Sequence, residues 1–173
     1  MTNFDERARD WDTPERKARA VAVAGAIRTA VPLSRSTRTI EVGAGTGPLG
    51  LALAGEVGDL VLAESSRGML EVIHEKLARG RSPRVSALAY DLLADPPPPE
   101  PFDLVISLLV LHHLRDTDGA LAAILRLLRP SGWMAIADLD AEDGSFHGPD
   151  AEGIHHQGFE RAAIASTARR LGF

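Results

Sequence analysis

The chain has 173 residues, of which 45% are hydrophobic and 25% are charged, as in ordinary globular proteins, and this length fits a single domain over residues 1–173. The formal charge of −5 is not accompanied by any basic run, which argues against a nucleic-acid partner. The absence of cysteine excludes disulfides, thiolate metal ligands and a cysteine nucleophile, and it is compatible with a reducing compartment.

The first residues do not have the pattern of a targeting segment. Asp5 and Glu6 stand where a secretory signal needs basic and then apolar residues. No apolar stretch along the chain is long enough to span a bilayer. We therefore expect a cytoplasmic protein with no membrane partner.

A first helix is predicted to begin at Pro14. Thr13 is a suitable N-cap, and the fixed φ of proline suits the first helical position. The apolar residues that follow in this helix are Ala18, Val21, Ala22, Ala24 and Ile27.

Five apolar runs alternate with helical patterns along the rest of the chain. They lie at about residues 38–42, 59–63, 84–89, 102–108 and 132–137. Such alternation is typical of a parallel sheet whose crossover helices cover both faces. The sequence therefore predicts an α/β fold with three layers and a Rossmann-like sheet.

Cap and stop signals mark the helices between the later strands. Ser66 is a candidate N-cap for a helix that would end at Gly80. Thr117 opens another helix, which Pro130 cannot continue. A last helix is expected at about residues 159–171.

The most informative stretch of the sequence is Glu41-Val42-Gly43-Ala44-Gly45-Thr46-Gly47, directly after the first strand. Glycine lets the backbone approach a ligand closely, and a helix over residues 48–57 would point its free N–H groups at that ligand. This geometry is typical of a nucleotide-cofactor site. The stretch from Gly45 to Gly50 also fits G-x-G-x-x-G, so the turn alone leaves NAD open, and a plain tight connection is a further alternative.

An acid, Glu64, ends the second predicted strand. A carboxylate at this place can accept hydrogen bonds from both hydroxyls of a ribose. NAD would need the same acid, and an ordinary exposed residue at a strand end is the alternative. Glu64 thus indicates a nucleotide cofactor but does not indicate which one.

Further motifs accompany the glycine stretch. They are Glu64-Ser65-Ser66-Arg67-Gly68-Met69-Leu70, Tyr90-Asp91-Leu92, Phe102-Asp103-Leu104-Val105-Ile106-Ser107 with His112-His113 after it, and residues 127–134. Together these motifs resemble class I S-adenosylmethionine-dependent methyltransferases over nearly the whole chain. The resemblance implies S-adenosylmethionine as cofactor and a small molecule as methyl acceptor.

The resemblance also implies which residues hold the cofactor. Glu41 and the carbonyls after it would hold the amino end, Glu64 the ribose, and Asp91 the exocyclic amine of the adenine. The full set implied is Glu41, Gly43, Ala44, Gly45, Gly47, Glu64, Ser65, Met69, Asp91, Leu92, Ser107 and Leu108.

The pair His112 and His113 follows the fourth strand, at the end of the sheet where ligands bind in open α/β folds. Either imidazole is a candidate base for an acceptor that must lose a proton. The alternative is that one of them caps or orients the backbone.

Two segments are expected to act as lids over this end of the sheet. One is the helical region 1–30, whose residues 4–11 resemble the leading helix of the family, and the other is the loop 141–158. Asp138, Asp140, His147, His155 and His156 lie in or beside that loop. We expect no metal there, because no chelating spacing is present.

Members of the family usually have seven strands, and no final β-hairpin follows the fifth strand here. We expect the fifth strand to be an unprotected edge, which another copy of the chain, loops or residues outside this sequence would cover. Two other functions stay open. A non-catalytic cofactor-binding or oligomerising module would fit a shortened sheet, and a nicotinamide oxidoreductase would fit the Gly45 to Gly50 match.

Overall fold

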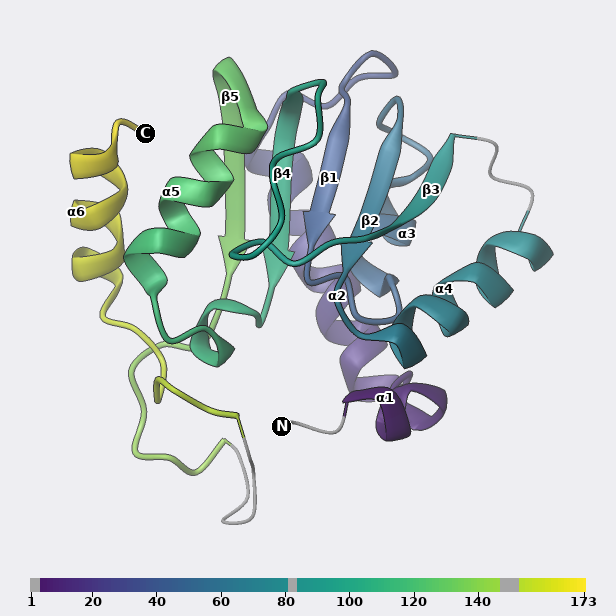
Figure 1. Ribbon diagram of the computed structural model, residues 1–173, viewed down its shortest axis with the longest axis horizontal. Coiled ribbons are helices and arrows are strands. Elements are labelled where there is room, and N and C mark those ends of the chain that lie inside the picture. The colour runs from purple at the N-terminus through teal and green to yellow at the C-terminus, as the bar shows by residue number, and fades with distance from the viewer. Residues whose placement is uncertain (1–3, 81–83, 147–152) are drawn as a thin grey trace.

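The computed structural model describes residues 4–80, 84–146 and 153–173 (Figure 1). A sheet of five parallel strands in the order β3-β2-β1-β4-β5 forms its centre. The strands are β1 (Thr39–Val42), β2 (Leu60–Glu64), β3 (Val85–Ala89), β4 (Phe102–Leu108) and β5 (Leu128–Ala137). All five predicted strands are confirmed, and the alternation with helices accounts for their parallel pairing.

Helices cover both faces of this sheet, as predicted. Figure 1 shows α2 and α5 on opposite sides of it. Their bounds, with those of the other helices, are α1 (Phe4–Arg7), η1 (Ala8–Asp10), α2 (Pro14–Ala30), α3 (Pro48–Leu53), α4 (Arg67–Arg79), η2 (Leu111–His113), α5 (Thr117–Leu127) and α6 (Arg161–Leu171). No helix in these described ranges is long and apolar enough to cross a bilayer.

Alternate residues of β4 supply the two layers of the core. Leu104 and Ile106 pack with α2 and α3, whereas Val105 packs with α5. Near-continuous burial of β1 and β4 on both faces is what a central parallel strand requires.

The predicted helix caps are confirmed by their hydrogen bonds. The side chain of Thr13 accepts from the N–H of Arg16, and the side chain of Ser66 accepts from the N–H of Met69. At α5 the cap is Asp116, one residue before the predicted opening at Thr117. An aspartate accepts from the free N–H groups of a first turn as well as threonine does.

The buried face of α2 differs from the apolar pattern in the sequence. The buried residues are Ala20, Ala24 and Ile27, whereas Val21 is 60% exposed. Alanine is frequent along the whole helix, so the hydrophobic pattern could not identify the face that packs on α3. Arg16, which is half-buried, lies on this same face of α2, one turn before Ala20.

Strand β5 is longer than predicted and lies at the edge of the sheet. It begins at Leu128, and a register shift separates the pairing of Leu128 from that of Trp133. Pro130 is tolerated because an edge strand can lack one donor. In the described ranges β5 pairs with β4 alone, and the side chain of Trp133 is 47% exposed.

Candidate functional site

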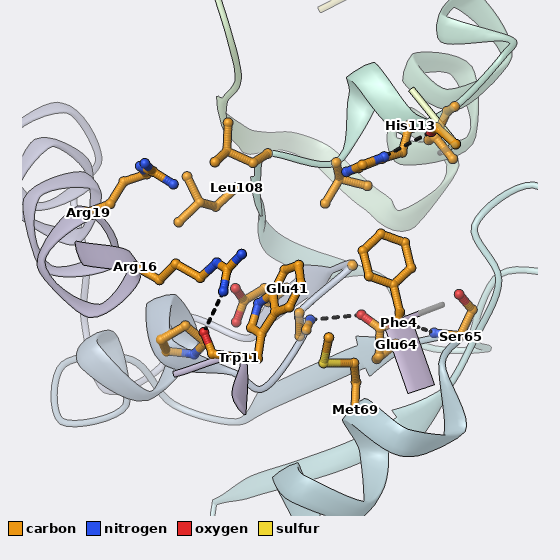
Figure 2. A pocket seen from close by; sticks show the side chains of 18 of the residues that line it. Phe4, Trp11, Arg16, Arg19, Glu41, Glu64, Ser65, Met69, Leu108 and His113 are labelled. Atoms are coloured by element: carbon orange, nitrogen blue, oxygen red, sulfur yellow. Dashed lines mark hydrogen bonds between the residues drawn. The ribbon is translucent and has the colours of Figure 1, made fainter. Parts of the chain in front are cut away.

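A cavity of about 600 Å³ opens at the carboxyl ends of β1, β2 and β4 (Figure 2). The turn after β1 forms one wall through Gly43 and Gly45, and Glu64 at the end of β2 forms another. The segment from Leu108 to Leu114 lies across from them. Cavities of this volume hold small molecules and cofactors, and ligands of open α/β sheets bind at this edge.

The glycine turn brings backbone to the surface of the cavity. Gly45 has φ of +56°, a conformation that side chains disfavour, and its N–H donates to Glu64 over 2.7 Å. A Cβ atom at Gly45 would lie 3.4 Å from the indole nitrogen of Trp11. The turn therefore lies directly under Trp11, with no room there for a side chain and a ligand together.

Glu41 is a buried acid in the last part of β1, and it borders the cavity. Its side chain is 2% exposed, and one carboxyl oxygen accepts from the N–H of Gly50 over 2.8 Å. Burial raises its pKa to about 8, because the single hydrogen bond from Gly50 only partly offsets the loss of water. Glu41 is thus largely neutral at pH 7 until a cation comes next to it.

Glu64 is the second acid of the cavity. Its carboxylate accepts from the N–H groups of Gly45, Ser65 and Ser66 at 2.7 to 2.9 Å. Burial raises its pKa, although these backbone hydrogen bonds act in the opposite direction. Two carboxyl groups on neighbouring strands therefore face one cavity, a pattern suited to amino and hydroxyl groups of a ligand.

The N-terminal segment forms a cover over this cavity. Figure 2 shows Phe4 and Trp11 at the cavity, and their rings meet edge to face at 5.7 Å between centroids. Phe4 also meets the ring of His113 at 5.3 Å. Arg16 lies 3.9 Å over the Trp11 ring and donates to its carbonyl oxygen. The cover therefore links α1 to the segment after β4.

Polar contacts fasten this cover to α4. Asp5 accepts from the N–H of Gly68 over 2.9 Å, within the first turn of α4. Asp12 forms an ion pair of 2.7 Å with Lys76 and accepts a short hydrogen bond from Thr46. The predicted N-terminal region is thus in contact with the glycine turn, although residues 1–3 lie outside the described residues.

The two adjacent histidines have different surroundings. His112 is 1% exposed, does not border the cavity, and its Nδ1 lies 2.6 Å from a carboxyl oxygen of Asp138. Burial alone would raise the pKa of Asp138, but the hydrogen bonds from His112 and the backbone outweigh it and lower that pKa. His113 borders the cavity, and its Nδ1 lies 3.0 Å from the carbonyl oxygen of Gly153.

The backbone of His112 also holds the loop after β5. Its carbonyl oxygen accepts from the N–H groups of His155 and His156 at 2.9 and 3.1 Å. Gly153 and His155 of this loop border the cavity. The described part of the predicted lid 141–158 therefore reaches the site, while residues 147–152, with His147, lie outside the described residues.

Three arginines of the cavity were not predicted from the sequence. Arg16 and Arg19 come from α2, and Arg115 follows η2. Arg16 alone has a sequence signal, its spacing, because it continues the face of Ala20 and Ala24 toward the sheet's carboxyl end. From sequence alone, an arginine on an amphipathic helix is ordinarily expected to be exposed to solvent.

The structure brings most of the predicted cofactor residues to this cavity. Those that border it are Glu41, Gly43, Ala44, Gly45, Glu64, Ser65, Met69 and Leu108, and those that do not are Gly47, Asp91, Leu92 and Ser107.

The four residues away from the cavity have local structural contacts. Gly47 caps α3 with φ of +82°, and the hydroxyl of Ser107 donates to Val42. Leu92 is part of the core, and Asp91 is exposed and caps a turn by accepting from Leu93 and Ala94. Their roles at a cofactor stay predictions.

A family model described as a methyltransferase domain matches residues 40–134, which is more than half of the chain. An uncharacterized methyltransferase of Schizosaccharomyces pombe is 29% identical over 139 residues, covering 72% of this chain and 49% of that protein. The ubiquinone/menaquinone biosynthesis C-methyltransferase UbiE of Erwinia tasmaniensis is 32% identical over 108 residues, covering 60% of this chain and 43% of its own. The chain thus spans about half the length of these relatives.

Among solved structures, a SAM-dependent methyltransferase from Aquifex aeolicus has a similar fold. Its TM-score is 0.77 at 18% sequence identity, and the match covers 97% of this chain and 87% of that one. At this identity the likeness concerns the fold alone.

Proposed function

Because this chain belongs to the family of class I S-adenosylmethionine-dependent methyltransferases, we propose that it transfers a methyl group from that cofactor to a small molecule. The observation that carries the proposal is the pair of buried acids, Glu41 and Glu64, which face one cavity across a glycine turn. Acids on neighbouring strands suit the two ends of a nucleoside with an amino-acid tail.

The residues present fit this cofactor in charge as well as in place. Glu41 is buried with a raised pKa, so a ligand ammonium would supply the missing partner. We assign the ribose hydroxyls to Glu64, which borders the cavity. Met69, which is 1% exposed, borders it as well, and an adenine base could pack on it. Asp91 and Ser107 keep their predicted roles as a proposal.

When bound, S-adenosylmethionine would supply an electrophilic methyl group, which would pass to the acceptor as its bond to sulfur broke and left the electron pair on sulfur. The protein's part is to align the acceptor and exclude water. Phe4 and Trp11 cover the cavity, and the fastening of Asp5 to Gly68 holds that cover in place. Both predicted lids serve this purpose in the proposal.

His113 is the better placed of the two predicted bases. It borders the cavity, and the carbonyl of Gly153 beside its Nδ1 favours a proton on that nitrogen. In the proposal His113 takes the proton from an acceptor that must lose one. His112 instead contacts Asp138 and orients the segment after β4. This is the alternative role that the sequence offered for one of the two histidines.

The remaining parts of the proposal concern partners and location. The acceptor is a small molecule, because the cavity is covered and holds about 600 Å³. We infer a cytoplasmic location, with which the lack of cysteine is compatible. The open edge of β5 with Trp133 is the surface through which two copies would pair, and a concentration-independent monomer in sedimentation would contradict this.

Calorimetric titration with S-adenosylhomocysteine beside NAD tests the cofactor. We expect micromolar binding of the first and none of the second, and binding of NAD alone would favour an oxidoreductase. Transfer of a labelled methyl group in an acceptor screen then separates an enzyme from a non-catalytic binding module.

A further inference from the structure

The charges around the cavity are unevenly divided. In the described ranges its two acids, Glu41 and Glu64, both lie on the side of the glycine turn and β2. The other side is formed by α2 and by the segments after β4 and β5. It carries three arginines and two histidines with no acid among the described residues, namely Arg16, Arg19, Arg115, His113 and His155.

These three arginines lack the ion pairs that most other arginines of the described chain form. Eight arginines elsewhere form ion pairs with acids, among them Arg28 with Glu56. None of the three at the cavity forms an ion pair in the described part of the chain, although the protein as a whole has a charge of −5. Positive charge therefore gathers on this side of the cavity with no ion pair from the described residues.

Two of them point into the cavity. Figure 2 shows Arg16 and Arg19 reaching in from α2, one turn apart. Arg16 is fixed by the ring and carbonyl of Trp11, and burial followed by repulsion from Arg7 and Arg19 lowers its pKa. An anion beside them would relieve that repulsion.

The cofactor does not account for all of this charge. S-adenosylmethionine has one carboxylate, which can engage one arginine in a bidentate pair. At least two cationic groups then face the acceptor. Apolar residues border the same cavity, namely Phe4, Leu108, Leu109, Val110 and Leu114.

We propose that the methyl acceptor is a small amphipathic anion, with a carboxylate or phosphate group held by Arg19 and Arg115 and an apolar body packed on Phe4 and the segment after β4. This inference rests on the function proposed above. Guanidinium groups suit both anions, since they bind either one through paired N–H donors.

Matched aromatic probes test the inference without the acceptor being known. Benzoate, phenyl phosphate, neutral benzamide and cationic benzylamine are titrated at constant ionic strength into protein saturated with S-adenosylhomocysteine. The readout is the NMR shift of the indole N–H of Trp11, and Trp133, the other tryptophan, is the internal reference on β5.

We expect at least one anion to bind about tenfold tighter than benzamide, the scale of a charge-assisted hydrogen bond. The anion that binds tighter identifies the preferred group. Arg19→Gln and Arg115→Gln should each remove most of this advantage. Arg35→Gln should keep it, because Arg35 is an exposed arginine before β1, at the opposite end of the sheet.

The outcomes separate this inference from the proposed function. If S-adenosylhomocysteine does not bind, the proposed function fails. If S-adenosylhomocysteine binds with unchanged affinity in both arginine variants, but the anions bind the unaltered protein no better than benzamide, the inference of an anionic acceptor is wrong. Tighter binding of benzylamine would overturn it as well.

Discussion

Glu41 shows how one residue can couple ligand binding to protonation. It lies within a strand that is buried on both faces, so its carboxyl group loses nearly all contact with water. Its pKa of about 8 means that the free protein holds a proton there at neutral pH. A ligand ammonium favours the ionised form, so binding must release that proton.

The pH dependence of cofactor affinity follows from this release. Below pH 8 a raised pKa opposes binding, so the affinity for S-adenosylhomocysteine should rise with pH, by up to about tenfold per unit, and level off above pH 8. Calorimetry at several pH values measures this slope. Glu41→Gln should bind more weakly and with a flat profile, and a flat profile in the unaltered protein would contradict the assignment.

Glu64 allows a second test at the scale of the residue. Glu64→Gln should weaken binding of S-adenosylhomocysteine by roughly 1.5–3 kcal/mol, the range for hydrogen bonds to a charged group. Glu71→Gln is a matched control, because Glu71 is an exposed acid on α4 whose partner is Arg67. If Glu64→Gln and the control had equal dissociation constants, the ribose would not bind at Glu64.

Among the elements, α1 and α4 depend on each other. In the first turn of α4 the N–H of Gly68 donates to Asp5, which places an acid at the positive end of the helix dipole. Gly68 permits this close contact, because a Cβ atom there would lie 2.5 Å from the carbonyl oxygen of Asp5. The cover of the cavity is thus positioned by a glycine outside it.

Gly68→Ala should release the cover while leaving the sheet intact. We expect faster hydrogen exchange over residues 4–11 and an affinity for S-adenosylhomocysteine that falls several-fold, since Phe4 and Trp11 border the cavity. The control is Gly25→Ala in α2, where a Cβ atom would meet nothing within 4 Å.

The control has a predicted effect of its own. Gly25→Ala should raise the free energy of unfolding by about 0.5–1 kcal/mol, because alanine loses less backbone entropy in a helix. Chemical denaturation measures this change. Faster exchange over residues 4–11 in both variants would contradict the specific role of Gly68.

For the whole molecule, the site joins parts that are distant in the sequence. The N-terminal cover, the glycine turn, the end of β2 and the segments after β4 and β5 all meet at one cavity. A ligand that contacts all of them stabilises the folded chain as a unit. Its binding should therefore be visible in the stability of the entire protein.

S-adenosylhomocysteine at a hundred times its dissociation constant should raise the free energy of unfolding by about 2.7 kcal/mol. For a chain of this size the corresponding rise in Tm is roughly 5–10 °C. Differential scanning calorimetry measures it, with NAD at equal concentration as the control. Equal shifts for both ligands would argue against the cofactor assignment.

Much of the fold could be predicted from local patterns. The five strands and the caps at Thr13 and Ser66 follow from periodicity and from hydrogen bonds between near neighbours in the chain. The glycine turn and the acids Glu41 and Glu64 were also visible, because their positions relative to strand ends determine where they lie. These features need no knowledge of distant contacts.

Other features depend on how distant segments pack. No local signal separates His112 from His113, and it is the contact of one with Asp138 that buries it and leaves the other at the cavity. The same holds for Arg16 and Arg19, which face the site because α2 buries Ala20 rather than Val21. Helix and strand periods are local, whereas burial and charge surroundings arise only when elements meet. The sequence alone therefore determined that Glu41, Glu64 and the glycine turn lie at one end of the sheet, and tertiary packing decided which histidine and which arginines border the cavity there.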